Sequence, residues 1–223
     1  MKTKNIAVLS CDIVSSTQYT PKVFKDLLEV IKEEFAIISG MYPTQKVLFA
    51  MSRGDSFQGI VEDSASALKI ALHLKAGIMK FGSETVQSKA VTNADVRISI
   101  GIGTADYNEN SIAESNGEAF HFSGRTLDKM KGESTKLTLT TSRKEVNEEF
   151  KVSFKFLDSV TDRWSISSAE VVYYLLKGYT EQQIADRLDR SQAAINLRKK
   201  AAGWEEIQLL LNRYEQVAKM YFV

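Results

Sequence analysis

The N-terminal part of the chain contains a strand-length segment that is apolar on both of its faces. Residues 5–14 include the uninterrupted apolar sequence Ile-Ala-Val-Leu. A strand that buries both faces occupies an inner position in a sheet that is covered on two sides. The run stops at Asp12, and no later stretch approaches the twenty apolar residues of a membrane-spanning helix. These observations predict a covered sheet and no membrane segment.

The composition is that of an ordinary globular protein, with 43% apolar and 26% charged residues. The formal net charge is +1, so any contact with nucleic acid has to come from a local basic patch. The single cysteine, Cys11, excludes an internal disulfide and a cysteine-based zinc site, and it fits a reducing compartment. We therefore expect a cytoplasmic protein.

Apolar periodicity divides the first part of the chain into alternating strands and helices. Thr20 and Pro21 form the cap and the first position of a helix. We expect strands at 5–14, 46–51, 56–61, 96–103 and 136–141, helices from 21 and over 64–81 and 118–131, and a polar loop at 105–116. The order β-α-β-β-α-β, extended by one helix and one strand, predicts an α+β fold of the ferredoxin-like type.

The pattern of the chain changes after Phe156 and Leu157, where strand signals disappear and only helical segments follow. We expect a boundary near 158–166. This divides the chain into an N-terminal domain at 1–160 and an all-α domain at 161–223.

Two acidic motifs, each at the end of an apolar run, are the strongest chemical signal. Asp12 follows the first strand, and Asp55 lies in the turn of the predicted hairpin. Two carboxylates that meet at one place can hold paired divalent metal ions over a nucleoside triphosphate. Taken alone, each has an ordinary explanation, because Asp12 could simply end a strand and Gly54-Asp55 is a common hairpin turn. Their joint occurrence favours a shared site.

The segment from Asp12 to Thr17, the Gly54-Asp55 hairpin and residues 117–125 resemble the three signature regions of class III nucleotide cyclases. With the Arg-x-Ser-Ile-Gly sequence at 97–101, they more closely resemble the SatD family, a set of small bacterial proteins with a cyclase-like domain. The resemblance covers about residues 1–158 and implies a cyclase-like variant of the ferredoxin-like fold.

The resemblance also implies roles for individual residues. Asp12 and Asp55 match the aspartates that hold Mg²⁺ or Mn²⁺, and Arg125 matches an arginine that stabilises the transferring phosphoryl group. His121 stands where the family has an asparagine, and Glu114 lies near the position of a base-reading aspartate. The phosphate-binding loop matches Ile13, Val14, Ser15, Ser16 and Thr17, whose small hydroxyl residues precede a helix N-terminus that favours an anion.

One departure concerns base recognition. The family reads the purine with a lysine three residues before the hairpin glycine, and Met51 occupies that position here. Methionine cannot donate a hydrogen bond to a base carbonyl. The resemblance thus implies that metal and phosphate contacts are retained while base recognition is lost or rebuilt. This favours nucleotide binding over conventional cyclisation and leaves turnover open.

The C-terminal helical segments resemble the winged or sigma-type helix-turn-helix of bacterial regulators. Thr180 and Gln183 form a capping box, and Ser191 is placed to cap the next helix after a turn at Asp189. Residues 177–203 carry six basic and three acidic side chains. If this part binds DNA, base edges would face Gln192, Ala193 and Asn196 after the Ser191 cap, and phosphates would contact Arg190, Arg198, Lys199 and Lys200.

The last segment, 204–222, carries one continuous apolar stripe that has to be buried in its own chain or against a second copy. Class III cyclase sites assemble across a two-fold interface and helix-turn-helix proteins bind paired half-sites, so we expect a homodimer. The favoured function is a bacterial regulator that couples a nucleotide- and metal-binding cyclase-like domain to a DNA-binding helix-turn-helix. The alternatives are an active cyclase or related phosphoryl-transfer enzyme, and an inactive interaction scaffold.

Overall fold

The first strand, β1 (Asn5–Ile13), runs through the middle of the sheet, as its two apolar faces require. The computed structural model describes residues 5–82, 94–109 and 111–223. β1 pairs antiparallel with β3 (Ser56–Val61) on one side and with β4 (Val96–Asn108) on the other. Within the described residues the sheet has the order β2-β3-β1-β4-β5, and β6 pairs with β4 in parallel. The first four strands therefore have the predicted ferredoxin-like topology.

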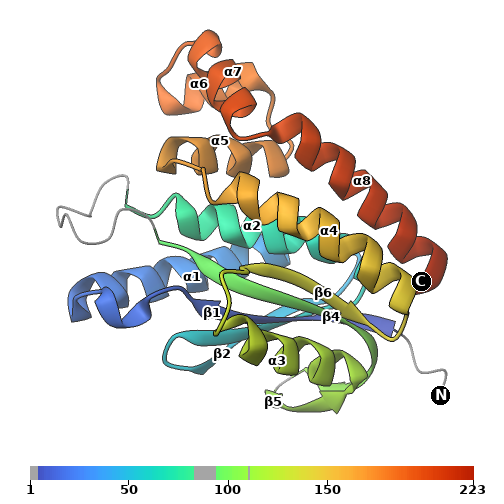
Figure 1. Cartoon of the computed structure of the whole chain (residues 1–223). Helices are drawn as coiled ribbons and strands as arrows, with labels where there is room; N and C mark the ends of the chain where they lie inside the picture. Colours follow the sequence, from blue (N-terminus) through green and yellow to red (C-terminus); the bar gives the residue numbers. More distant parts are fainter. Residues whose placement is uncertain (1–4, 83–93, 110) are drawn as a thin grey trace.

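The remaining elements follow the predicted order closely (Figure 1). They are the strands β2 (Val47–Arg53), β5 (Ser111–Gly117) and β6 (Leu137–Thr141), the 3₁₀ turns η1 (Ser16–Gln18) and η2 (Ser64–Ser66), and the helices α1 (Pro21–Met41), α2 (Ala67–Met79), α3 (Glu118–Met130), α4 (Lys144–Thr161), α5 (Ile166–Leu176), α6 (Glu181–Leu188), α7 (Gln192–Ala201) and α8 (Trp204–Tyr221).

The prediction of a loop at 105–116 is wrong. β4 continues to Asn108 and β5 returns beside it, with Ala105 opposite Gly117 and Asp106 opposite Asn116. This hairpin lies at the edge of the sheet and most of its side chains are not buried, so backbone pairing holds it without the apolar alternation that marks a buried strand.

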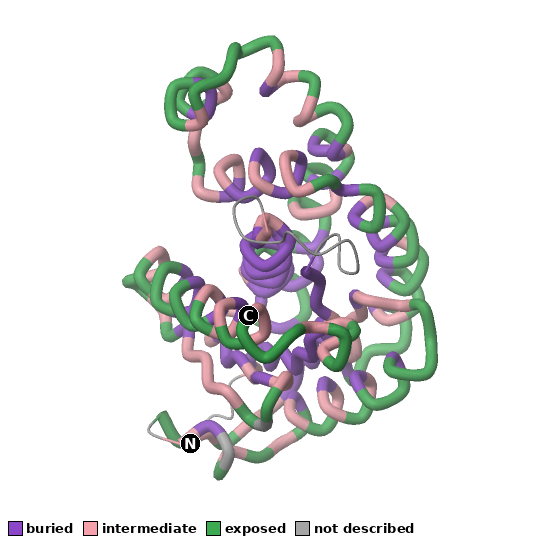
Figure 2. Tube along the Cα trace, turned by 90° about the vertical axis from the view of Figure 1, so that its left-hand side faces the viewer, coloured by how far each residue is buried: buried purple, intermediate pink, exposed green. Residues whose placement is uncertain are grey.

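The two faces of the sheet carry different helices. α1 and α2 lie on one face and α3 on the other (Figure 1). Leu9 and Cys11 of β1 point into the larger core with α1 and α2, whereas Ile6 and Val8 belong to the smaller core under α3. α2 is buried along nearly its whole length (Figure 2), because α1, α5 and α8 cover the sides that the sheet leaves free.

Two glycines of β4 allow α3 to approach the sheet closely. A Cβ on Gly101 would lie 2.3 Å from the Ala119 carbonyl oxygen and 2.6 Å from the Ser123 nitrogen, and one on Gly103 would lie 2.8 Å from the Cβ of Glu118. Any side chain at these positions would push α3 away from the strand.

The C-terminal stripe is buried within its own chain. α8 packs on η2, α2 and α4, and the hydroxyl of its buried Tyr214 donates to the Ser64 carbonyl at 3.1 Å. α4 ends at Thr161, next to the expected domain boundary. Because α8 returns to the N-terminal part, most of the stripe is buried within the chain, although Tyr221 near its end is exposed. The burial of the stripe therefore does not require the expected homodimer.

α5, α6 and α7 form a small core of their own around Val171, Ile184, Ala185 and Ile195. The capping box of Thr180 with Gln183 is present. Ser191 accepts a hydrogen bond from the Ala194 nitrogen at the start of α7, and Asp189 adopts the left-handed conformation in the turn between the helices. The local capping signals in the sequence are confirmed.

We expect the buried His73 of α2 to make stability depend on pH. Its ring packs edge-on against Tyr173 with 4.8 Å between centroids, and burial followed by the charge of Lys177 lowers its pKa to about 3. Below about pH 6.5 His73 is therefore protonated in the unfolded chain but neutral in the folded chain. The free energy of unfolding falls as pH decreases. Between pH 7 and pH 5 the protonation of His73 alone lowers the free energy of unfolding by about 2 kcal/mol.

Urea unfolding at the two pH values tests this expectation. The His73→Phe variant retains an aromatic ring beside Tyr173 and should lose about 2 kcal/mol less than the unaltered chain over the same interval. Equal losses in the two proteins would contradict the assignment of the pH dependence to His73.

Candidate functional site

Asp12 and Asp55 lie at the same end of the sheet. Asp12 is opposite Ser56 in the register of β1 with β3, and the Ile13 nitrogen donates to the Asp55 carbonyl at 3.0 Å. The Ser16 hydroxyl donates to the Asp55 carboxylate, and the Ser56 hydroxyl donates to Asp12 Oδ1 at 3.2 Å. The end of β1, the hairpin turn and the start of the next loop are thus joined around the two carboxylates.

Two cations that the sequence analysis did not assign lie beside Asp12. Arg97 stands opposite Asp12 in the register of β1 with β4, and its guanidinium is 3.4 Å from Asp12 Oδ2. The ammonium of Lys131, just after α3, is 3.7 Å from Asp12 Oδ1. Both distances exceed the 2.7–2.9 Å of a strong charge-assisted hydrogen bond. A competing phosphate could therefore attract either cation without breaking a tight ion pair.

The two carboxylates fit a divalent metal ion that is held jointly with phosphate oxygens. Mg²⁺ prefers oxygen ligands and is usually held by one or two protein carboxylates together with substrate phosphates. Asp12 is buried and Asp55 is partly buried, so both can be ordered before a ligand binds. In the described part of the chain no group of three or more His, Cys, Asp or Glu could hold a metal by itself. Two carboxylates are a donor set that suits a Mg²⁺ or Mn²⁺ ion shared with a bound phosphate.

The predicted phosphate loop is only partly available to a ligand. The nitrogens of Ile13 and Val14 already donate to the carbonyls of Asp55 and Asp95, whereas those of Ser15, Ser16 and Thr17 have no acceptor among the described residues. Ser15 is left-handed, with φ of 54°, and a single 3₁₀ turn follows. The helix that should favour the anion begins at Pro21 with Thr20 as its cap, as the sequence predicts, and the 3₁₀ turn at Ser16–Gln18 lies between the loop and this helix.

A buried ionic network of Lys75, Asp95 and Lys136 holds the start of the predicted phosphate loop in place. The Lys75 ammonium of α2 is 2.5 Å from Asp95 Oδ1, and Lys136 is 2.8 Å from Asp95 Oδ2. Burial opposes the charged form of Asp95, but the two ammonium groups outweigh it and hold the pKa of Asp95 below its ordinary value. Because the Asp95 carbonyl binds the Val14 nitrogen at 2.9 Å, the network fixes the backbone at the start of the loop.

Arg125 and His121 do not join Asp12 and Asp55 within one chain. Both are exposed and lie one turn apart on α3, away from the buried side of the helix that Ser123 and Leu127 occupy. Glu114 is exposed on β5, where it accepts a hydrogen bond from Asn108 at 3.1 Å. The matched residues thus form two groups, one at the end of β1 and one on the outer surface of α3 and β5.

Two further side chains near the carboxylates belong to the core. Met51 packs against the larger core from β2 and is only partly buried. Cys11 is completely buried, and burial together with the charge of Asp12 raises the pKa of its thiol well above the ordinary value. Cys11 is therefore a neutral packing residue, as its place in the strand suggests.

The residues predicted to bind DNA are divided by an intramolecular contact. Asn196, predicted to face base edges, donates to Glu181 of α6 at 3.2 Å, and the Lys199 ammonium lies 2.8 Å from the same carboxylate. The other residues predicted to bind DNA make no such contact with Glu181. Arg198 is partly buried, and the exposed positions are Arg190, Ser191, Gln192, Ala193 and Lys200.

No protein-family model and no curated protein matches the chain. Among solved structures it is similar to the catalytic core of a rhodopsin-guanylyl cyclase with converted specificity in complex with ATPαS, at 19% identity and a TM-score of 0.40 over 55% of this chain and 71% of that one. It is also similar to adenylate cyclase from Trypanosoma brucei in its monomeric state, at 16% identity and a TM-score of 0.43 over 56% and 68% of the two chains.

A third similar structure is the active GGEEF domain of a diguanylate cyclase from Vibrio cholerae, at 14% identity and a TM-score of 0.40 over 63% of this chain and 85% of that one. These three solved structures are all nucleotide cyclases or their domains. The resemblance to the SatD family and the helix-turn-helix stay predictions. No helix in the described residues is long and apolar enough to cross a membrane.

Proposed function

We propose that the cyclase-like part of the chain binds a nucleoside triphosphate together with Mg²⁺ or Mn²⁺, and that two copies of the chain form a phosphoryl-transfer site of the nucleotide-cyclase type. The observation that carries the proposal is the joining of Asp12 and Asp55 by the 3.0 Å hydrogen bond from the Ile13 nitrogen to the Asp55 carbonyl. This hydrogen bond brings Asp12 and Asp55 together at the mouth of one loop, and carboxylate oxygens are ligands that Mg²⁺ prefers.

The roles of the surrounding residues follow from their chemistry. A bound metal would neutralise phosphate charge and polarise the phosphoryl oxygens. Asp12 and Asp55 would hold it, and Arg97 and Lys131 would attract the remaining phosphate oxygens. The free backbone nitrogens from Ser15 to Thr17 would donate to a phosphate as well.

The phosphoryl-transfer site would be completed by residues of a second copy of the chain. Arg125 and His121 are exposed on α3 and make no contact with Asp12 or Asp55 among the described residues, so we assign them to the site of another molecule. A two-fold axis would place each pair against the carboxylates of the partner. Since Met51 has no donor for a base, we expect weak discrimination among bases.

Incubation with Mn²⁺ and each of the four nucleoside triphosphates, followed by mass spectrometry, tests the proposal. We expect a cyclic product, and we expect Asp12→Asn and Asp55→Asn each to reduce its formation by at least about 100-fold, because the metal loses half of its protein ligands. Asp186→Asn, on the exposed surface of α6, is the matched control and should leave the rate unchanged. Metal-dependent nucleotide binding without product would leave a binding domain, and no binding at all would refute the proposal.

We propose as a second function that α6 and α7 form a helix-turn-helix that binds duplex DNA. The specific observation is the turn itself, in which left-handed Asp189 and the Ser191 cap set the two helices around Ala185 and Ile195. The exposed start of α7 would then enter the major groove, and Arg190 would contact phosphates at its flank.

The affinity of the double variant Arg190→Ala/Lys200→Ala for duplex DNA tests this second function. Both side chains are exposed, so their loss should weaken binding to any sequence and lower the salt dependence by about one unit of slope for each lost contact. Lys151→Ala/Lys155→Ala, on the exposed side of α4, makes the same charge change elsewhere. Equal affinity of the two variants for duplex would count against the helix-turn-helix.

A further inference from the structure

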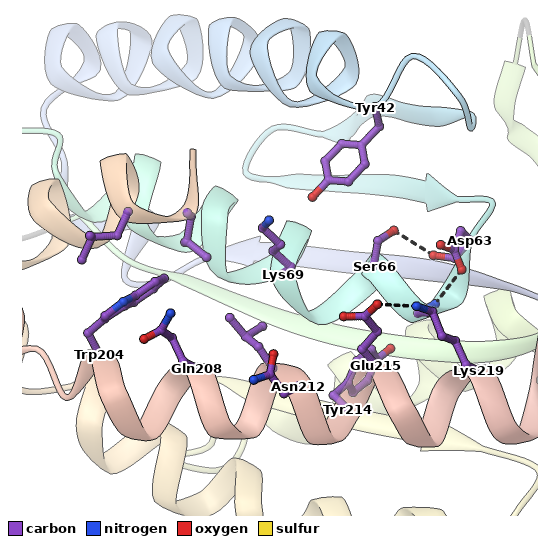
Figure 3. Close-up of a pocket in the computed structure, with 14 residues that line it drawn as sticks. Tyr42, Asp63, Ser66, Lys69, Trp204, Gln208, Asn212, Tyr214, Glu215 and Lys219 are labelled. Atoms are coloured by element: carbon purple, nitrogen blue, oxygen red, sulfur yellow. Dashed lines mark hydrogen bonds and ion pairs between the residues drawn. The ribbon is translucent and has the colours of Figure 1, made fainter. Parts of the chain in front are cut away.

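A pocket of about 400 Å³ lies between α2 and α8, away from the Asp12 and Asp55 site. Its walls come from the end of α1, from η2 and α2, and from α5 and α8 (Figure 3). Asp55 precedes β3 and η2 follows it, so the six residues of β3 separate the two sites by roughly 20 Å. The pocket is within the usual range of volume for small-molecule sites.

Several polar side chains converge on this pocket without forming hydrogen bonds to one another. Tyr42 enters from the end of α1, Lys69 from α2, and Gln208 and Asn212 from α8 (Figure 3). Within the described residues, none of the four has a side-chain hydrogen bond or ion pair. Burial and the nearby carboxylate of Asp63 raise the pKa of Tyr42 to about 12, so its hydroxyl keeps its proton and can donate.

The opposite part of the lining is apolar and aromatic. Leu175 and Leu176 of α5 and Leu211 of α8 form its floor, and the indole of Trp204 closes one end. Such a surface suits the face of a flat ring, which gains dispersion energy on an aromatic and aliphatic floor. The amides of Gln208 and Asn212 each offer donors and an acceptor, the combination that reads the edge of a nucleobase.

The charges of the lining limit the charge of the ligand. Asp63 and Glu215 balance Lys69 and Lys219, and Glu215 and Lys219 pair with each other at 2.5 Å. Lys69 is therefore the cation that remains for an anionic group, while Asp63 would repel a second negative charge. A ligand with a single charge fits this balance better than a dianion.

We infer that the pocket between α2 and α8 binds a mononucleotide whose phosphate carries one negative charge, with the phosphate at Lys69 and Tyr42 and the base against Trp204, Gln208 and Asn212. A 3′,5′-cyclic nucleoside monophosphate has this charge, and the choice of that probe rests on the proposed function, because a cyclase domain would release it. Bound there, the ligand would join α8 to η2, where Tyr214 already contacts Ser64.

Fluorescence of Trp204 provides a readout that is independent of activity. The chain has two tryptophans, so Trp164→Phe leaves the pocket residue as the only indole. The four 3′,5′-cyclic nucleoside monophosphates and 5′-AMP are each titrated against the full-length Trp164→Phe chain. We expect at least one cyclic nucleotide to give a saturable change in fluorescence. We expect 5′-AMP, a dianion, to bind at least about tenfold more weakly. If Trp164→Phe does not fold, calorimetry on the unaltered chain replaces fluorescence.

Variants at the two sites separate this inference from the proposed function. Lys69→Ala should weaken binding of the cyclic nucleotide at least about tenfold. The matched control Lys151→Ala should not weaken it, and Asp12→Asn should retain it even where product formation is lost. Absence of binding by all four cyclic nucleotides, unchanged binding by Lys69→Ala, or loss of binding in Asp12→Asn would each overturn the inference.

Discussion

An equal mixture of Asp12→Asn and Arg125→Ala chains should regain phosphoryl-transfer activity that neither variant has alone. In the proposed site the carboxylates come from one copy, and Arg125 comes from the other. A mixed dimer then contains one site with both changes and one site with none. If exchange is random, half of the dimers are mixed and each has one intact site, so the mixture should reach about a quarter of the activity of the unaltered chain.

The control is a pair of changes on the same side of the proposed interface. Asp12→Asn mixed with Asp55→Asn removes a carboxylate from every possible site and should stay inactive. The measurement is the rate of product formation after the two variants are mixed, exchanged and assayed with Mn²⁺. A mixture of Asp12→Asn and Arg125→Ala that stays inactive, although light scattering shows mixed dimers, would contradict a site shared between copies.

The sequence predicted the sheet well because its strands lie in the core. The apolar run of β1 requires an inner position in the sheet. The ferredoxin-like order of the elements then predicts β3 and β4 as its neighbours. The edge hairpin of β4 and β5 escaped prediction because its stability comes from backbone pairing, which has no side-chain signature.

The positions of charged side chains around Asp12 can be predicted from the sequence where they follow strands, but not where the packing of a helix places them. Arg97 alternates with the buried isoleucines of β4, and its place opposite Asp12 follows once the register is known. Lys131 has no such pattern, because only the packing of α3 on the sheet brings it to Asp12. The buried pair of Lys75 and Asp95 was likewise missed, since a lysine in an apolar helix reads as an exposed position until its partner is seen.

Removing the Lys75 ammonium should be among the most destabilising single changes in this chain. Its side chain is completely buried, and it contacts both Asp95 Oδ1 and, at 3.3 Å, the Val96 carbonyl. Lys75→Met keeps the bulk of the side chain but leaves the buried Asp95 charge with Lys136 as its remaining ammonium partner. Breaking a buried ion pair from one side costs about 3–5 kcal/mol, and the remaining partner places the expected loss near the lower end, at about 3 kcal/mol.

Denaturant unfolding of three variants can distinguish this charge effect from a loss of packing. Lys75→Met/Asp95→Asn should regain part of the lost stability, because the unpaired charge has gone, whereas Lys136→Met should cost less than Lys75→Met, because Lys136 is partly exposed. The low pKa of Asp95 means that the ion pair stabilises the chain at neutral pH, and this contribution is lost as pH falls below about 4. If Lys75→Met is as stable as the unaltered chain at pH 7, the ion pair does not support the loop at Val14, and the backbone geometry that joins Asp12 to Asp55 must rest on the strand pairing alone.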